Sequence, residues 1–319
     1  MKLRTAVVGV GYLGRFHAQK YKLIDRSELI GVYDVNKARA EEVAHELNVR
    51  AFSSLEEIAG QVDAATIATT TSSHFEIAKF FLERGVHLHV EKPITTNSVE
   101  AQTLCDLARS RKLKLQVGHV ERFNPALVAA EAKLKKPLFI ECHRLAPFKP
   151  RGVDVNVVLD LMIHDLDMIL HLVKSEPVSV AAVGTPVLTR TDDIANARIE
   201  FSSGAVANVT ASRVSLNSQR KFRVFQEAQY LSMDFGSGEV RLFTKTGEWN
   251  GEGSPPIDME SWNLEKSDAL LCETEAFVDS CLSDQPCVVT GEDGLRALRL
   301  AEQIIGAIEK RSERDDRRR

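Results

Sequence analysis

Short apolar runs alternate with helical patterns along the first 120 residues of the chain. Thr5–Val10 and Leu29–Tyr33 are the first two runs, and DAATIATT, VHLHVEKPI and LKLQVGHV follow them. Between the runs, stretches such as KARAEEVAHEL and HFEIAKFFLERG space their apolar residues three and four apart, as an amphipathic helix does. Alternating buried strands and helices predict an α/β domain built on a parallel sheet.

The pattern changes after residue 120. A helical stretch NPALVAAEAKLKK, a strand LFIECHRL and the loop Ala146–Pro150 lead to an apolar helix predicted over residues 155–173. Alternating residues then predict an antiparallel hairpin that turns at Ser203-Gly204, followed by further strands and two closing helices. We therefore expect a first domain over 1–120 and a second over 121–319, the second an α+β domain with an open, mostly antiparallel sheet.

Helix start and stop signals agree with this reading. Ser98 is expected to cap the helix SVEAQTLCDLARSRK, and the Gly-Glu-Asp-Gly stretch at 291–294 is expected to open the last helix. The charged end RSERDDRRR mixes both signs and follows a complete helical pattern. It is expected to be a solvated helix end rather than an arm for nucleic acid.

The composition is that of an ordinary soluble globular protein. The 319 residues are 44% hydrophobic and 27% charged, and their net charge of −4 with dispersed basic residues argues against nucleic acid or an anionic membrane as a partner. The five cysteines contain no CxxC pair, so neither a disulfide framework nor a zinc knuckle is indicated. The start of the chain lacks a signal-peptide pattern, and no apolar run reaches membrane-spanning length, so a cytoplasmic location is expected.

A glycine-rich turn joins the first two strands. Gly9, Gly11 and Gly14 follow the first strand and open a helix, and Asp34 ends the second strand about twenty residues later. In a dinucleotide site these glycines make the turn, leave room for the pyrophosphate and let the helix approach the strand, while the acid accepts hydrogen bonds from a ribose 2′-hydroxyl. The alternative is a purely structural role, in which three glycines form a turn beside a surface aspartate.

The identity of Asp34 favours NAD over NADP, because a carboxylate at this position repels a 2′-phosphate. The residues Asn36, Lys37 and Arg39 follow closely and could instead hold that phosphate, so NADP stays possible. Ligands of open α/β sheets bind beyond the carboxyl ends of the strands, where three patches occur: Thr69–His74, Glu91–Pro93 and Gly118–Asn124.

The apolar helix of the second domain has acidic and histidine side chains that need an explanation. Asp160 and His164 are four residues apart, so they share a helix face, and His171 follows one heptad later. A histidine beside a carboxylate can accept a hydroxyl proton, and Lys92 could reach the same point from the other domain. The alternatives are a stabilising ion pair or a metal site for Asp160 and His164, and a solvated lysine for Lys92.

Together these motifs resemble the Gfo/Idh/MocA family of NAD(P)-dependent sugar oxidoreductases over essentially the whole chain. The matching features are GVGYLG at Gly9–Gly14, the ATxxxxH patch at Ala68–His74, Glu91-Lys92-Pro93 and Asp160-xxx-His164. The resemblance implies a Rossmann domain followed by an α+β domain whose open sheet mediates dimers or tetramers. One departure is Thr70, where the family often has proline, and it bears on the cofactor contacts of that patch alone.

The resemblance also implies roles for individual residues. Lys92, Asp160 and His164 match the catalytic trio, and no metal is implied. The cofactor contacts fall on the glycine turn, the acid after the second strand and the two later patches, namely Gly9, Gly11, Tyr12, Leu13, Gly14, Asp34, Thr69, His74 and Glu91.

Within the family, GHVERFNPA and DLMIHDLDMIL look most like members that oxidise the 3-hydroxyl of UDP-N-acetylglucosamine to a ketone. That likeness implies substrate contacts from Lys92, His164, Arg122 and Asn124, because an arginine suits a phosphate and an amide suits hydroxyls. For Arg122 and Asn124 the alternative is a capping or surface role near Pro125. Two other functions stay open: a dehydrogenase of a free sugar or inositol, and a non-catalytic NAD(P)-binding regulator with a protein partner.

Overall fold

The computed structural model describes residues 2–149, 155–265 and 267–316. The chain folds as two compact units, the first made of residues 1–123 and 268–298 and the second of 124–267 and 299–319. Pro150, at the end of the loop predicted at Ala146–Pro150, and the last three residues of the charged C-terminal run lie outside the described residues. Among the described helices, none combines the length and the apolar character needed to cross a bilayer.

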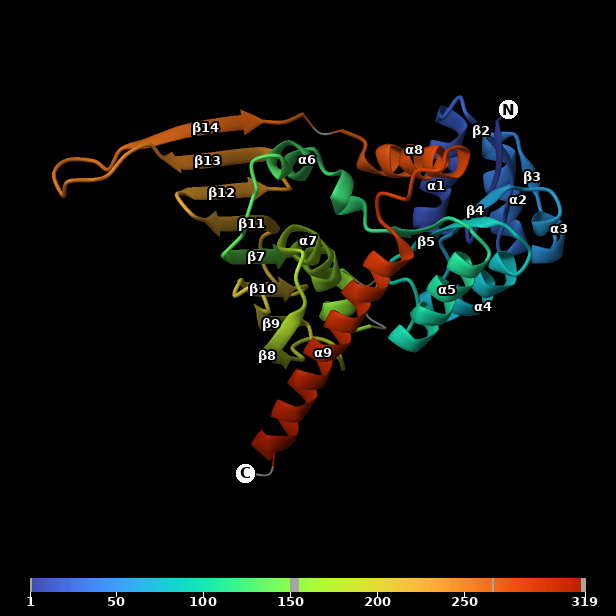
Figure 1. Cartoon of the computed structure of the whole chain (residues 1–319). Coiled ribbons are helices and arrows are strands. Elements are labelled where there is room, and N and C mark those ends of the chain that lie inside the picture. The colour runs from blue at the N-terminus through green and yellow to red at the C-terminus, as the bar shows by residue number, and fades with distance from the viewer. Residues whose placement is uncertain (1, 150–154, 266, 317–319) are drawn as a thin grey trace. The chain divides into compact units, whose positions relative to one another are not determined.

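The first unit is built on a six-stranded sheet in the order β3-β2-β1-β4-β5-β6 (Figure 1). Its strands are β1 Leu3–Val8, β2 Ser27–Tyr33, β3 Arg50–Ala51, β4 Ala64–Ile67, β5 His87–Glu91 and β6 Leu115–Gly118. All neighbouring strands are parallel, as the alternation of strands and helices predicted. Ala64–Ile67 is buried at every position, which is why that strand reads as a continuous apolar run.

Helices follow the strands of this sheet. They are α1 Tyr12–Leu23, α2 Lys37–Leu47, α3 Leu55–Ala59, α4 Thr71–Leu82, α5 Ser98–Ser110 and α8 Ala269–Leu282, with a 3-10 turn η1 at Val120–Phe123. Phe277 and Val278 of α8 join the same buried cluster as Val7 and Val32 of the sheet. The last helix, α9 Gly291–Asp316, belongs to the first unit up to Leu298 and to the second unit beyond it.

The predicted cap of α5 is shifted by one residue, whereas α9 begins at Gly291, as the Gly-Glu-Asp-Gly stretch predicted. The carboxamide of Asn97, rather than Ser98, caps α5 by accepting a hydrogen bond from Glu100 N at 3.0 Å. At α9 the cap is Thr290, whose hydroxyl oxygen accepts from Asp293 N at 3.2 Å while the Asp293 carboxylate accepts from Thr290 N at 2.9 Å. Each cap lies at the residue before the first helical one. The cap of α5 is a single side-chain hydrogen bond, and that of α9 is a reciprocal pair.

The second unit has an eight-stranded sheet in the order β14-β13-β12-β11-β7-β10-β9-β8. Its strands are β7 Phe139–Leu145, β8 Pro177–Thr185, β9 Ile194–Phe201, β10 Val206–Ser212, β11 Gln219–Gln226, β12 Gln229–Asp234, β13 Glu239–Lys245 and β14 Ile257–Asn263. Only β7 and β10 pair in parallel among these described strands, so the predicted mostly antiparallel sheet is confirmed. The predicted hairpin joins β9 to β10, with Gly204 at φ +85°.

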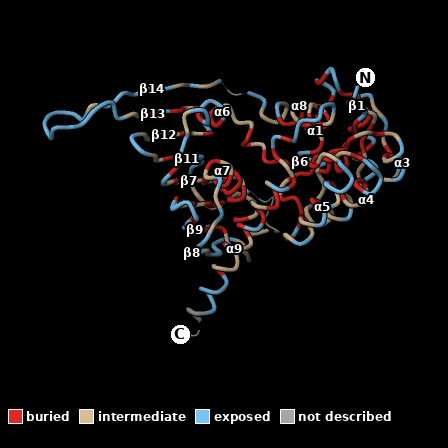
Figure 2. Tube along the Cα trace, viewed as in Figure 1, coloured by how far each residue is buried: buried red, intermediate tan, exposed pale blue. Residues whose placement is uncertain are grey.

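Helices α6 Pro125–Glu131 and α7 Ile163–Val173 contact the sheet through β12, β13 and β7. Burial alternates along β7, since Ile140 and Cys142 are buried while Phe139 and Glu141 are half-buried. Most of helix α7 is buried (Figure 2). The helix predicted over 155–173 is not uniform. Val158–Met162 form a π-helical turn, η2, and the regular helix begins only at Ile163.

Candidate functional site

The turn after β1 is packed so closely that two of its glycines cannot be replaced. Gly9 has φ +83°, and a Cβ on it would lie 2.6 Å from the Thr69 methyl carbon. A Cβ on Gly14 would lie 1.8 Å from the Gly9 carbonyl oxygen. A Cβ on Gly11, in contrast, would meet no atom within 4 Å, so the turn leaves open space beside the start of α1.

The start of α1 has the features of an anion site. Gly11 is the N-cap and provides no side-chain hydrogen bond, and the first turn contains no acidic residue. Because the first N–H groups of a helix have no partner within the helix and its dipole is positive there, this end favours a phosphate. The side chains of Tyr12 and Leu13 are 70% and 39% exposed at the same end. The residues therefore fit a dinucleotide pyrophosphate.

Asp34 stands half-buried at the end of β2 and is tied to the glycine turn. Its Oδ2 accepts a hydrogen bond from Val10 N at 2.8 Å, and its Oδ1 accepts from Asn36 N at 2.9 Å. A carboxylate has about four acceptor positions, so it retains capacity for ribose hydroxyls. This fixed position fits the predicted ribose contact.

Two of the three residues that could have held a 2′-phosphate, Asn36 and Arg39, have other partners. The Asn36 carboxamide caps α2 by accepting from Arg39 N at 3.2 Å. The Arg39 guanidinium donates to the Val10 carbonyl at 2.9 Å and to Glu42 at 2.8 Å. This arrangement favours NAD over NADP.

His74 joins two of the predicted cofactor patches. Its Nδ1 is 3.0 Å from the Pro93 carbonyl oxygen, and its Nε2 is 3.1 Å from the Thr69 carbonyl oxygen. Burial lowers the pKa of His74, while the two carbonyl oxygens beside its ring act in the opposite direction by favouring the protonated form. The loop after β4 and the Lys92-Pro93 turn, whose peptide bond is cis, are therefore held together by this side chain.

Glu91, at the end of β5, is buried, and its Oε1 lies 2.7 Å from Nε2 of His17 on α1. Burial alone would raise the pKa of Glu91, but the hydrogen bond and charge of His17 outweigh it and leave the pKa below its usual value. Lys92, the next residue, is half-exposed. Among the described residues, the donor atoms of His17, Glu91 and Glu273 all lie within 4.8 Å of one another, which is a spacing that a metal ion could use.

In the second unit, Asp160 and His164 lie on one short stretch at the change from η2 to α7. Both side chains are half-buried. Asn156 starts this stretch: its carbonyl oxygen accepts from Asp160 N at 3.1 Å and its carboxamide accepts from Leu159 N at 3.1 Å. A π-helical turn often marks a functional site.

Two buried arginine–aspartate pairs hold this stretch against the sheet. Arg144 of β7 donates to both carboxylate oxygens of Asp165 at 2.9 Å, directly after His164. Arg213 donates to Asp193 at 2.8 Å and to the Val155 carbonyl at 2.7 Å. Sequence reasoning missed both pairs, because partners 20 and 21 residues apart leave no local pattern.

Three further side chains have structural roles. The Asn124 carboxamide caps α6 by accepting from Ala126 N at 3.1 Å, which is the capping role weighed from the sequence. Arg122 is buried, with its guanidinium 3.9 Å from the Asp293 carboxylate. His171 bonds Glu131 of α6 at 2.7 Å.

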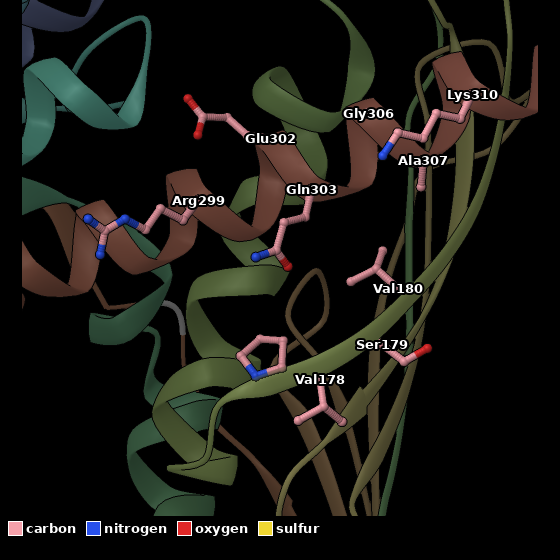
Figure 3. A pocket seen from close by; sticks show the side chains of 10 residues that line it. Val178, Ser179, Val180, Arg299, Glu302, Gln303, Gly306, Ala307 and Lys310 are labelled. Carbon is pink, nitrogen blue, oxygen red and sulfur yellow. The ribbon is translucent and has the colours of Figure 1, made fainter.

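A pocket of about 660 Å³ opens in the second unit between β8 and the later part of α9. Arg299, Gln303 and Lys310 of the helix and Val178 and Ser179 of the strand line it, and Gln303 points from the helix toward the strand (Figure 3). The described residues that line it include none of the predicted catalytic, cofactor or substrate residues. The candidate residues lie elsewhere, in the glycine turn and the Lys92 turn of the first unit and in the η2–α7 stretch of the second unit.

Comparison with known proteins extends the resemblance. Residues 3–119 match the family model described as an oxidoreductase family with an NAD-binding Rossmann fold, and residues 136–232 match the GFO/IDH/MocA C-terminal domain. UDP-N-acetylglucosamine 3-dehydrogenase of Acidithiobacillus ferrooxidans is 43% identical over 96% of this chain and 97% of its own length. A solved structure of that enzyme superposes with a TM-score of 0.92, at 42% identity over 97% of this chain and 98% of its own.

A more distant relative is the scyllo-inositol 2-dehydrogenase (NAD(+)) of Bacillus subtilis strain 168. It is 31% identical over 67% of this chain and 68% of its own length. The chain thus matches proteins that act on a sugar nucleotide and on a free polyol.

Proposed function

Because the chain belongs to the Gfo/Idh/MocA family of NAD-binding oxidoreductases, we propose that it oxidises the 3-hydroxyl of UDP-N-acetylglucosamine to the 3-keto sugar nucleotide with NAD. The observation that carries the substrate is the 43% identity to an enzyme of that activity over 96% of this chain. The scyllo-inositol relative supports a free polyol as the second candidate, at 31% identity over 67% of the chain.

The first unit holds the cofactor in this proposal. The N–H groups at the start of α1 bind the pyrophosphate, Gly11 leaves space for it, and Asp34 accepts from the ribose. Tyr12, Leu13, Thr69, His74 and Glu91 complete the surroundings of the dinucleotide. When bound, the nicotinamide supplies the hydride acceptor.

Side chains of the protein remove the proton of the reacting hydroxyl in this proposal. Oxidation of a secondary alcohol breaks the C–H bond of the reacting carbon and the O–H bond of its hydroxyl group. A base must therefore take the hydroxyl proton while the hydride leaves. We assign the removal of this proton to Lys92 and His164, of which one accepts it and the other holds the hydroxyl in place, with Asp160 orienting the histidine. Arg122 and Asn124 are proposed substrate contacts in addition to their structural roles.

Single and double substitutions test the catalytic assignment. Lys92→Ala and His164→Ala are each expected to lower kcat by about 10²–10⁴-fold, because positioned acid–base groups contribute that much. His171→Gln is the matched control, since this histidine lies on the same helix and pairs with Glu131; its turnover should equal that of the wild type. Wild-type turnover in the Lys92→Ala, His164→Ala double variant would rule the assignment out.

We also propose that the protein is a cytoplasmic homodimer or homotetramer that associates through the open face of its large sheet. On that face half-buried rings form a ladder across β7, β11, β12 and β13: Phe139 and Phe225 are 5.5 Å apart, Phe225 and Tyr230 4.7 Å, and Tyr230 and Phe243 5.4 Å. Aromatic rings are enriched in interfaces between protein chains. Free thiols at all five cysteines suit a reducing compartment.

A further inference from the structure

Four ionisable side chains are buried together in the first unit, next to the Lys92 turn. They are His17 of α1, His89 and Glu91 of β5, and Glu273 of α8, with exposures of 0–7%. The His17 and His89 rings meet edge to face at 5.0 Å, and His89 Nε2 is 3.7 Å from a Glu273 carboxylate oxygen. Buried ionisable groups cost free energy unless they are paired or neutral, so a cluster of four needs an explanation.

The Glu91 carboxylate in this cluster is held from three directions. Oε1 bonds His17 at 2.7 Å, and Oε2 accepts from the backbone N–H of Lys92 at 3.2 Å. The third direction is closed by Gly118, which pairs with Glu91 across the sheet; a Cβ there would lie 3.0 to 3.1 Å from the carboxylate atoms. The carboxylate therefore has one position, and that position fixes the start of the Lys92 turn.

His17 is itself tied to the glycine turn of the cofactor site. It lies three residues after Gly14, on the buried face of α1. The same helix lies close to the glycine turn, because a Cβ on Gly14 would be 1.8 Å from the Gly9 carbonyl oxygen. A continuous series of contacts thus runs from the glycine turn through α1 and His17 to Glu91 and then to Lys92.

We propose that His17 is a positioning residue, which acts through Glu91 to place Lys92 relative to the cofactor-binding turn. The inference rests on the proposed function for its kinetic part. Its physical basis is that a displacement of about 1 Å at a reacting group can cost about a hundredfold in rate. His17 touches neither reacting atom in this account.

Two substitutions of His17 that differ in side-chain length test the proposal. His17→Gln places a carboxamide N–H close to the position of Nε2 and should retain turnover within about threefold, whereas His17→Asn is too short and should lower kcat about tenfold to a hundredfold. The Kd for NAD, measured by calorimetry, should change less than twofold in both. His87→Gln is the control: this histidine on the same strand accepts from Lys114 N at 2.9 Å, and its loss should leave kcat unchanged.

A second variant reaches Glu91 from the opposite side. Gly118→Ala leaves His17 intact but presses on the carboxylate, which must move slightly; it should therefore lower kcat in the same direction as His17→Asn but by a smaller factor. This variant decides the question if His17→Asn fails to fold. Wild-type kcat in folded Gly118→Ala and His17→Asn would overturn the proposal.

A readout without substrate separates this proposal from the proposed function. After reductive methylation with ¹³C, the Lys92 signal in an NMR spectrum is identified by its loss in Lys92→Arg. We expect this signal to shift in His17→Asn and Gly118→Ala and to stay in place in His17→Gln and His87→Gln. An unmoved signal in the first two variants contradicts the role of His17, whereas inactivity of the wild type on UDP-sugars contradicts only the proposed function.

Discussion

At the scale of single residues, Asp34 is the proposed determinant of which dinucleotide binds. The carboxylate is fixed by Val10 N and Asn36 N, and Arg39 is engaged elsewhere. Replacing Asp34 with Ala should weaken NAD binding about tenfold, because a hydrogen bond to a charged group contributes about 1.5–3 kcal/mol, and should reduce the preference for NAD over NADP. Calorimetric titration with both dinucleotides measures this, and an unchanged NAD affinity and preference would contradict the role of Asp34.

Residues whose environment is set by neighbours in sequence could be predicted. The positions of four residues in and beside the glycine turn were predicted, because one strand–turn–helix unit determines their surroundings: Gly9, Gly11, Gly14 and Asp34. His17 was not, since its partner Glu91 is 74 residues away. A histidine on the buried face of a helix, three residues after the last glycine, was the one available signal for it.

At the scale of elements, the loop before β9 is organised around the carboxylate of Asp193. Burial works to raise the pKa of Asp193, but the backbone N–H groups of Thr189, Leu188 and Val187 and the Arg213 guanidinium outweigh it and hold the pKa well below its usual range. The N–H contacts are 2.5 to 2.8 Å long. The charged form is therefore the one that the folded state stabilises.

Asp193→Asn tests this with a defined dependence on pH. At pH 7 the variant should lose about 3–5 kcal/mol of unfolding free energy, because one partner of a buried pair is removed. A carboxylate with a lowered folded-state pKa stabilises above its unfolded pKa of about 3.9 and loses that contribution as pH falls below it. Denaturant unfolding from pH 7 to 3 should show the gap to wild type narrowing toward pH 3. A constant gap would contradict the account.

The elements themselves were largely predictable from periodicity, because strands and helices bury alternate or three-to-four-spaced residues. The π-helical turn at Val158–Met162 was not, since its apolar residues also fit a regular helix. The cap at α5 was placed one residue late, at Ser98, because Asn97 and Ser98 are both good cap residues.

At the scale of the whole molecule, the aromatic ladder of the open sheet face predicts self-association. Tyr230 lies in its middle, stacked on Phe225 and Phe243. Tyr230→Arg should shift the protein toward monomer in analytical ultracentrifugation, because a charge in the centre of an apolar interface is costly. Exposed Leu216→Arg is the control. An unchanged sedimentation coefficient for Tyr230→Arg would place the interface elsewhere.

The order of predicted strands and helices indicated two folding units. It did not indicate that the C-terminal residues are divided between the two units. Residues 268–298 pack in the first unit, with Phe277 in its core. An amphipathic helix shows which face it buries but not which sheet it covers, so helix α8 has no local signal for its partner.

The central claim is tested most directly by absorbance of reduced nicotinamide. Purified protein is mixed with NAD and UDP-N-acetylglucosamine, free N-acetylglucosamine or scyllo-inositol, with a trap for the ketone product. We expect NADH to form with the UDP-sugar and not with the other two. NADH formation only with a free sugar or inositol would contradict the proposed substrate, and silence with all three from protein that binds NAD would favour a non-catalytic regulator.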